Sequence, residues 1–224
     1  MKRDRLSIHI SDSAEIAVEE RRNGIKRIKN ISINDLLVCI KSSLREIKPV
    51  YHAVLPKNAL FYSCCPETGD FSAAIEYPYS KAAVTYMATE YPDFPLPKLV
   101  FGFKIGGNGK IRRVCLGVTE SGILRENSKM FLYPFSNVSN DFSLCTGDNE
   151  LPKINSPYSL SNMPDYILSM PDNDDHFEPK NNRLKLGHRE LMEHLADKSP
   201  EYYYSYILIP SGKTLANFYE AVSL

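Results

Sequence analysis

Alternating apolar and polar residues near the beginning of the chain predict β-strands. The apolar side chains that follow this two-residue period are Leu6, Ile8, Ile10, Ile16 and Val18. Such a period places one face of a strand against other apolar groups and leaves the other face polar. Asn23 and Gly24 both tolerate positive φ, which favours a tight turn between strands. We therefore expect a hairpin over residues 5–31.

Three later segments repeat apolar residues at the three- to four-residue spacing of an amphipathic helix. They are residues 32–47, 187–196 and 213–222. Ser32 stands three residues before Asp35, which resembles a capping box with Asp in the place of Glu or Gln. This pair predicts that the first helix begins next to Ser32.

Most of the remaining apolar runs are short and rich in β-branched or aromatic residues, which favours strands. These strand candidates are residues 50–55, 59–64, 71–77, 98–105, 110–118 and 202–209. The glycine-rich stretch 106–109 lies between two of them, so we interpret it as a hairpin turn and not as a phosphate-binding loop. Residues 119–182 are rich in Pro, Asn, Ser and Asp, and we expect an irregular segment there. Strands, a helix, more strands and then helices predict an α+β fold.

Charge and cysteine content narrow the class of protein. The 224 residues carry 27 basic and 27 acidic side chains, a net charge of zero, whereas nucleic-acid and anionic-membrane binders usually have a basic excess. No apolar run approaches the roughly 18 residues of a membrane-spanning helix. The five cysteines have irregular spacing and form no Cys-x-x-Cys pair. These features predict a cytoplasmic protein that binds neither nucleic acid nor a membrane.

One cysteine has a neighbour that suits acyl transfer. Asn137 stands eight residues before Cys145. A thiolate that attacks a thioester carbon generates an oxyanion, and a rigid amide donor stabilises that charge. Cys145 is therefore the candidate nucleophile, and Asn137 is the candidate oxyanion donor.

The order of two segments resembles that of ubiquitin-conjugating enzymes. Those enzymes carry a Tyr-Pro-x-x-Pro-Pro-Lys-Val-x-Phe type stretch, followed by His-Pro-Asn and, eight residues after that Asn, by the catalytic cysteine. The matching residues of the first segment are Tyr91, Pro92, Pro95, Pro97, Lys98 and Phe101. Asn137 and Cys145 supply the second segment, in which Phe135 and Ser136 replace the His-Pro.

The chain is still more similar to a bacterial branch, the prokaryotic ubiquitin-conjugating-enzyme-like family D, which includes protein B of the PRTRC plasmid cassettes. The matching stretches are Phe131-Leu132-Tyr133-Pro134-Phe135, Asn137-Val138 and Cys145-Thr146-Gly147. The resemblance covers about residues 50–180. It implies an α+β fold with a ubiquitin-conjugating-like antiparallel sheet and flanking helices in residues 50–224. Residues 1–49, a hairpin and a helix, are expected to belong to the same domain, and residues 102–128 contain an inserted hairpin.

The resemblance also implies a function. Cys145 is expected to accept a ubiquitin-like modifier as a thioester from an adenylating activating enzyme and to pass it to an amine or a partner. His176, or Asp174 and Asp175 beside it, are candidates to accept a proton from the attacking amine. The reaction needs no cofactor, and none is expected. His188 and His194 are six residues apart and lack a zinc-binding spacing, so no metal site is expected either.

A second interpretation stays open. The same fold is able to persist with a silent cysteine, as a module that presents a modifier or scaffolds an assembly. The replacement of His-Pro by Phe135 and Ser136 is compatible with this interpretation. A plasmid-maintenance component that touches DNA gains no support from the neutral charge.

Overall fold

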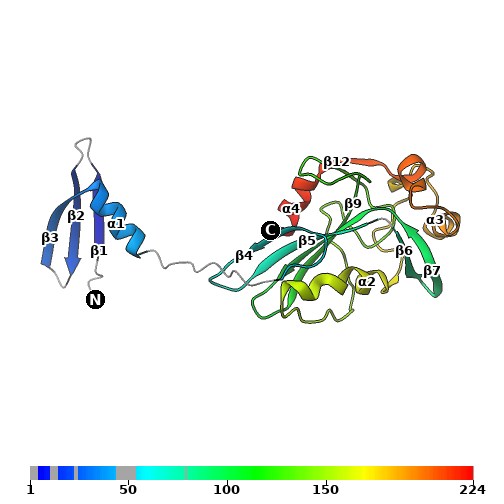
Figure 1. Ribbon diagram of the computed structural model, residues 1–224, viewed down its shortest axis with the longest axis horizontal. Helices are drawn as coiled ribbons and strands as arrows, with labels where there is room; N and C mark the ends of the chain where they lie inside the picture. Colours follow the sequence, from blue (N-terminus) through cyan, green and yellow to red (C-terminus); the bar gives the residue numbers. More distant parts are fainter. Residues whose placement is uncertain (1–4, 11–14, 23–24, 44–53, 79, 224) are drawn as a thin grey trace. The chain divides into compact units, whose positions relative to one another are not determined.

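The computed structural model describes residues 5–10, 15–22, 25–43, 54–78 and 80–223. The chain divides into two compact units, Met1–Pro49 and Val50–Leu224 (Figure 1). The expectation that residues 1–49 belong to the same domain as the rest stays a prediction.

The first unit contains a three-stranded antiparallel sheet within its described residues, in the order β1-β2-β3, and one helix. Its elements are β1 (Arg5–Ile10), β2 (Glu15–Arg22), β3 (Ile25–Ser32) and α1 (Ile33–Ser43). The sequence predicted strands here, and the structure adds a third strand to the hairpin. The capping prediction is confirmed: the Ser32 hydroxyl accepts from the Asp35 amide at 3.1 Å and donates to the Asp35 carboxylate at 2.8 Å. The predicted turn at residues 23–24 and the helix end at 44–47 lie outside the described residues.

The second unit is built on a six-stranded antiparallel sheet, counted over the described part of the chain, in the order β12-β10-β9-β8-β5-β4. These strands are β4 (Ala59–Cys64), β5 (Phe71–Tyr77), β8 (Leu99–Ile105), β9 (Ile111–Thr119), β10 (Lys129–Phe131) and β12 (Pro210–Thr214). The predicted turn is confirmed between β8 and β9, where the Gly109 amide donates to the Gly106 carbonyl at 2.7 Å. Gly109 adopts φ +79°, which favours glycine.

A smaller sheet lies beside the large one in the same unit. It contains β11 (Pro171–Asp172), β6 (Ser80–Tyr86) and β7 (Thr89–Leu96), in that order. β6 and β7 form an antiparallel hairpin, and β11 pairs with β6 in the parallel sense. The proline-rich stretch that precedes Phe101 is therefore extended, as expected, and most of it belongs to β7.

Helices cover both faces of the large sheet. They are η1 (Pro157–Asn162), α2 (Met163–Leu168), η2 (Pro179–Asn181), α3 (His188–Leu195), η3 (Tyr203–Ile207) and α4 (Leu215–Ser223). Phe101 and Phe103 of β8 pack with α2 and α3 in one buried cluster, whereas Val100 packs with α4 in another. Gly102 faces α4, where an added Cβ would lie 2.2 Å from Val222 Cγ2. The absence of a side chain lets α4 approach the sheet.

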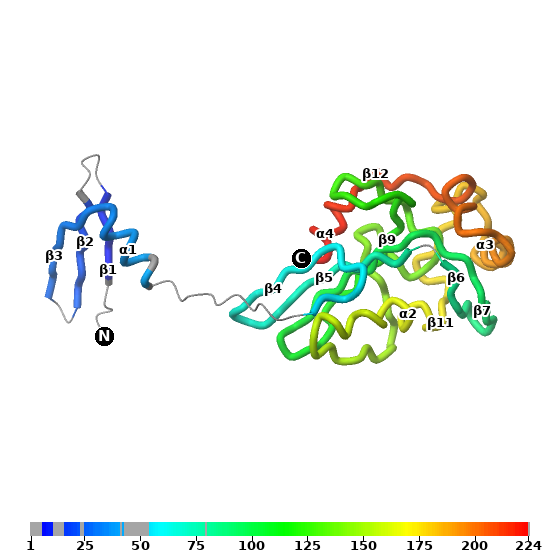
Figure 2. The backbone as a smooth tube through the Cα atoms, viewed as in Figure 1, coloured from blue at the N-terminus to red at the C-terminus, as the bar shows by residue number. Residues whose placement is uncertain are grey.

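The C-terminal helix returns to the beginning of the unit. In Figure 2, α4 lies beside β4, and the Phe61 and Tyr219 rings stack with their centroids 5.1 Å apart. No helix within the described residues is long and apolar enough to cross a membrane.

The α+β class is confirmed, and the predicted helices correspond to α1, α3 and α4. The strand predicted over residues 202–209 is wrong. Tyr203–Ile207 forms a turn of π-helix, in which the Leu208 amide donates to the Tyr203 carbonyl at 2.9 Å. Burial outweighs the strand propensity of tyrosine here, because the fully buried Tyr203 side chain donates to the Pro95 carbonyl.

Two other expectations need correction. Residues 54–55 belong to no strand, and residues 50–53 of that candidate lie outside the described residues. The segment 119–182 holds β10, η1, α2, β11 and η2, which its polar composition concealed. β6 was missed because alanines interrupt its pattern of large apolar residues.

Candidate functional site

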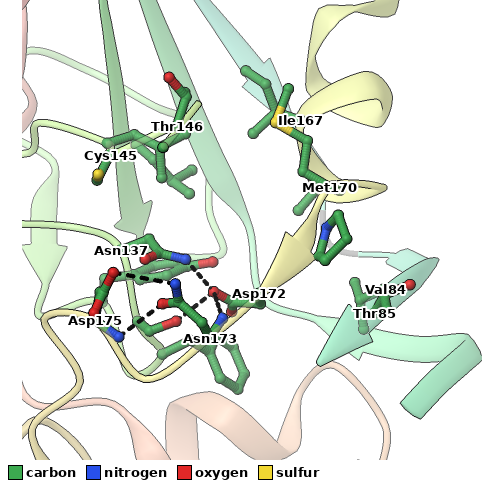
Figure 3. Close-up of a pocket in the computed structure, with 18 of the residues that line it drawn as sticks. Val84, Thr85, Asn137, Cys145, Thr146, Ile167, Met170, Asp172, Asn173 and Asp175 are labelled. Carbon is green, nitrogen blue, oxygen red and sulfur yellow. Dashed lines mark hydrogen bonds between the residues drawn. The ribbon is translucent and has the colours of Figure 1, made fainter. Parts of the chain in front are cut away.

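A pocket opens between the small sheet, α2 and the loop that contains Cys145. Its lining residues are Val84, Thr85, Phe94, Leu96, Leu116, Tyr133, Phe135, Ser136, Asn137, Leu144, Cys145, Thr146, Gly147, Asn149, Ile167, Leu168, Met170, Pro171, Asp172, Asn173, Asp175 and Met192. Figure 3 shows Cys145 and Thr146 on one side of the pocket, Ile167 and Met170 on another, and a polar group around Asp172 at the base.

The loop before Cys145 is attached to β9 by backbone hydrogen bonds. The Leu116 amide donates to the Phe142 carbonyl, and the Leu144 amide donates to the Val114 carbonyl, both at 2.9 Å. Phe142 is buried against Phe218 of α4, with ring centroids 5.2 Å apart. The sheet and α4 therefore hold the chain on both sides of the loop.

Within this loop, Asn137 and Cys145 are brought together. The Cys145 amide donates to the Asn137 carbonyl at 2.8 Å, and Val138 and Leu144 form a β-bridge between them. The eight-residue interval is thus the length of a closed loop. Cys145 itself is exposed at the rim of the pocket. An exposed thiol satisfies the accessibility that thiolate chemistry requires.

Asn137 has a conformation that few residues other than glycine adopt readily. Its φ is +62°, and asparagine tolerates this left-handed region better than most residues. Its backbone amide donates to the Asp175 carbonyl at 2.7 Å, and its side-chain amide donates to the Asp172 carboxylate. An amide nitrogen carries two hydrogens, so the bond to Asp172 leaves capacity for a second donation.

Asp172 is the central polar group at the base of the pocket (Figure 3). One oxygen of its carboxylate accepts hydrogen bonds from the Ser136 hydroxyl and the Asn137 side chain, and also from the Asn173 amide at 3.0 Å. Burial raises the pKa of the Asp172 carboxyl above its usual value, against the opposing effect of these donors and of His188. A carboxylate held in this way is a strong proton acceptor for its type.

His188, the first residue of α3, lies beneath this base and is only 4% exposed. Its ring stacks on Phe177 at 4.5 Å between centroids and lies 4.3 Å from the Tyr86 ring. Nδ1 is 3.0 Å from Asp174 Oδ1, and Nε2 is 3.9 Å from Asp172 Oδ2. Nε2 makes no hydrogen bond to any of the described residues. The imidazole therefore lies between two carboxylates, with its second nitrogen toward the pocket base.

Asp174, whose side chain is more than half exposed, is the hydrogen-bond partner of His188 Nδ1. Its Oδ1 accepts from the Tyr86 hydroxyl at 2.8 Å as well as from His188. The Tyr86 bond, followed by the His188 bond, lowers the pKa of Asp174, while burial raises the pKa of Tyr86 to about 12. Asp174 therefore stays ionised to a lower pH than an ordinary aspartate, and Tyr86 keeps its proton at neutral pH.

The residues proposed from the sequence separate into three groups. Cys145, Asn137 and Asp175 line the pocket, whereas Asp174 does not line it and is hydrogen-bonded to His188. His176 is exposed in a turn at φ +60° and is not among the lining residues. All five residues stay candidates: Cys145 as the nucleophile, Asn137 as the oxyanion donor, and the other three as proton acceptors.

Sequence reasoning missed Asp172 and His188. Asp172 begins the same acidic run as Asp174 and Asp175, so the run was noticed but its least exposed member was not identified. His188 was considered only as a metal ligand. The sequence signal available was its place at the start of an amphipathic helix, on the same face as Leu191 and Leu195.

The pocket has an acidic base and an aliphatic wall. Asp172 and Asp175 are its charged side chains among the described lining residues, and no Lys, Arg or His lines it. Val84, Ile167 and Met170 supply apolar surface. No group of three or more metal-ligating side chains occurs in the part of the chain that the structure describes.

Comparison with family models, with curated proteins and with solved structures finds no match to this chain.

Proposed function

We propose that this chain carries a ubiquitin-like modifier as a thioester on Cys145 and transfers it to an amine or a partner protein. The observation that carries the proposal is the loop at the rim of the pocket. It holds an exposed thiol beside Asn137, at the interval found in the ubiquitin-conjugating enzymes that the sequence resembles. The proposal includes a ubiquitin-conjugating-like fold for residues 50–224 and a cytoplasmic location.

The first step is a thioester exchange. The Cys145 thiolate attacks the carbonyl carbon of the modifier thioester, a new C–S bond forms, and the thiolate of the adenylating enzyme leaves with the electron pair of the broken bond. The oxyanion of the tetrahedral intermediate needs a donor, and the Asn137 side chain is the candidate. Its bond to Asp172 orients the amide before the reaction begins.

The second step is attack by an amine on the same carbonyl carbon. The C–S bond breaks, the Cys145 thiolate leaves, and the amine loses a proton. Asp172 is the best-supported acceptor because it lines the pocket and burial raises its pKa. Asp175 lines the same pocket, and His176 and Asp174 stay weaker candidates. The acidic base attracts an ammonium group, and Val84, Ile167 and Met170 suit an aliphatic stem.

The thioester is tested first with a peptide that ends in a Gly-Gly thioester, followed by intact mass spectrometry. A second assay uses a bacterial adenylating enzyme with its ubiquitin-like modifier and ATP. We expect one adduct that free thiol removes. It should persist when Cys39, Cys64, Cys65 and Cys115 are replaced by alanine and should disappear in Cys145→Ala.

The matched control is Cys64→Ala, which removes another exposed thiol and leaves the pocket intact. The proposal fails if neither assay gives an adduct on Cys145, or if Cys64→Ala removes the adduct as completely as Cys145→Ala does.

One observation favours the second candidate function, a catalytically silent binding or scaffold module. The Asn137 amide already donates to Asp172, and Phe135 and Ser136 stand where the enzymes carry His-Pro. Such a module binds the modifier without forming a thioester. Isothermal titration with the modifier distinguishes the two: equal affinity for the unchanged chain and for Cys145→Ala, with no adduct in either, supports the module.

A further inference from the structure

The first unit exposes an apolar stripe along β1. Leu6, Ile8 and Ile10 are 65%, 44% and 75% exposed. Ile8 lies directly opposite Val18 and Ile10 lies opposite Ile16, and directly opposed residues of an antiparallel pair share a face of the sheet. The β1 stripe, defined as Leu6, Ile8 and Ile10, thus lies on the face that contains the buried Ile16.

A second apolar stripe runs along α1. Ile33, Leu37 and Ile40 follow the i, i+4, i+7 spacing of one helix face, and each is more than 40% exposed. Leu36, beside them, is half-buried. α1 packs on β2 and β3. It therefore covers only part of the sheet, and the α1 stripe, defined as Ile33, Leu37 and Ile40, has no apolar cover of its own among the described residues.

This unit lacks the usual means by which so small a structure becomes stable. Ile16 is its one buried apolar side chain among the described residues. Units of about 40–50 residues generally need a disulfide, a metal or a partner. Residues 1–49 contain a single cysteine, Cys39, which is not in a disulfide, and the described residues hold no group of metal ligands. A partner surface is the remaining source of burial.

We propose that two copies of this chain associate through their first units, with the β1 stripe of each copy on the α1 stripe of the other. The two stripes have similar lengths: Leu6 to Ile10 spans about 13 Å at the rise of a strand, and Ile33 to Ile40 spans about 10 Å at the rise of a helix. Each stripe consists of three large apolar side chains. In a dimer with two-fold symmetry, the β1 stripe of each copy packs on the α1 stripe of the other, so both kinds of stripe become buried.

The amount of apolar surface also suits a dimer. Each copy contributes six large apolar side chains from the stripes, and Val38, 64% exposed, lies beside them on α1. At ordinary side-chain areas these exposed fractions amount to several hundred Å² per copy, comparable with the ~800 Å² that each partner contributes to a standard specific interface. Monomeric proteins rarely leave a contiguous apolar patch larger than a few hundred Å² in water.

The test uses sedimentation velocity of the full chain over a range of concentrations. The unchanged chain should sediment with twice the chain mass. Ile8→Lys and Leu37→Glu each place a charge on one stripe, and each should raise the dimer dissociation constant about 30-fold or more, as at an interface hot spot. Mixing the two variants should restore a dimer, because the lysine introduced on the β1 stripe of one copy then meets the glutamate introduced on the α1 stripe of the other. The remaining two stripes of that mixed dimer stay apolar.

Ile28→Lys is the matched control. Ile28 is 61% exposed but pairs with Glu19, on the opposite face of the sheet, so the dimer should persist. The proposal is overturned if the unchanged chain is monomeric at all concentrations, as it would be if another part of the same chain covered the stripes. It is also overturned if the dimer survives both charge substitutions, or if Ile28→Lys disrupts it as strongly as Ile8→Lys.

Discussion

Cys145 lies at the exposed rim of the pocket, whereas His188 lies beneath its base and is almost fully buried. The rim is held by backbone hydrogen bonds, such as that from the Cys145 amide to the Asn137 carbonyl. The base is held by side chains, in which Asp174 and Phe177 fix the imidazole. A thiol at such a rim is free to react without disturbing its support.

The difference between the rim and the base of the pocket indicates which positions tolerate substitution. A side chain at the rim contributes little packing, so its removal leaves the free energy of unfolding nearly unchanged. A side chain at the base contacts several others, so its removal leaves a cavity and unpaired polar groups. The proposed nucleophile is therefore replaceable without loss of fold, and the groups that tune the pocket are not.

The largest expected contrast is between two thiols. Cys115 lies in β9 under the same loop, is buried, and has its pKa raised by burial, whereas Cys145 is exposed. Alkylation of Cys145 in the native protein should be at least about 1,000-fold faster, because Cys115 reacts only when the chain opens. Peptide mass spectrometry after timed iodoacetamide treatment measures both rates. Similar rates for the two would contradict the structure of the loop.

Replacement of His188 by alanine should destabilise the protein more than any change at the rim. The lost stacking on Phe177, the lost contact with the Tyr86 ring and the loss of one of the two hydrogen bonds to Asp174 predict a decrease of roughly 2–5 kcal/mol in the free energy of unfolding. Cys145→Ala, the matched rim variant, should change it by less than about 0.5 kcal/mol. Urea unfolding followed by fluorescence measures both. Equal losses would remove the distinction between rim and base.

Asp172→Asn tests the chemical role of the base with little change in shape. An asparagine oxygen is still able to accept from Ser136 and Asn137, so thioester formation on Cys145 should continue. Discharge of the thioester to free lysine should slow by about 100-fold if the carboxylate takes the proton. Single-turnover discharge assays from pH 6 to 9 measure it. Asp148→Asn, which changes an exposed carboxylate outside the pocket lining, is the control and should leave the discharge rate unchanged. An unchanged discharge rate in Asp172→Asn would exclude Asp172 as the acceptor.

The smallest expected effect is on the pH dependence of stability. The pKa of Asp174 is lowered in the fold, so its contribution is present above the ordinary carboxyl pKa and is lost as pH falls through the lowered value. The pKa of Asp172 is raised, so its contribution is present below the ordinary value and is lost as pH rises through the raised one.

Asp174→Asn should therefore flatten the loss of stability in acid, by less than about 1 kcal/mol because Asp174 is more than half exposed. Asp172→Asn should change the pH slope in the opposite direction. Urea midpoints between pH 3 and 7 measure both slopes. If the two substitutions changed the pH slope of stability in the same direction relative to the unchanged chain, the assignment of the two carboxylates would be contradicted.

Local patterns were sufficient for much of the architecture. The period of Leu6, Ile8 and Ile10, and the pairing of Ser32 with Asp35, determine a strand and a helix start through contacts within a few residues. The glycines at 106–109 determine a turn in the same way, because backbone freedom is a property of the residue itself. The eight-residue interval from Asn137 to Cys145 was also visible.

Tertiary structure decided the rest, since it depends on burial between residues far apart in the chain. Asp172 and Asp175 look alike in one acidic run, and only the packing of β11 against β6 covers most of the first and leaves the second exposed. Tyr203 has a strand former's propensity, but its hydroxyl reaches the Pro95 carbonyl from a π-helical turn. A carboxylate largely removed from water beside His188 acquires a raised pKa from desolvation, which no local pattern of residues encodes.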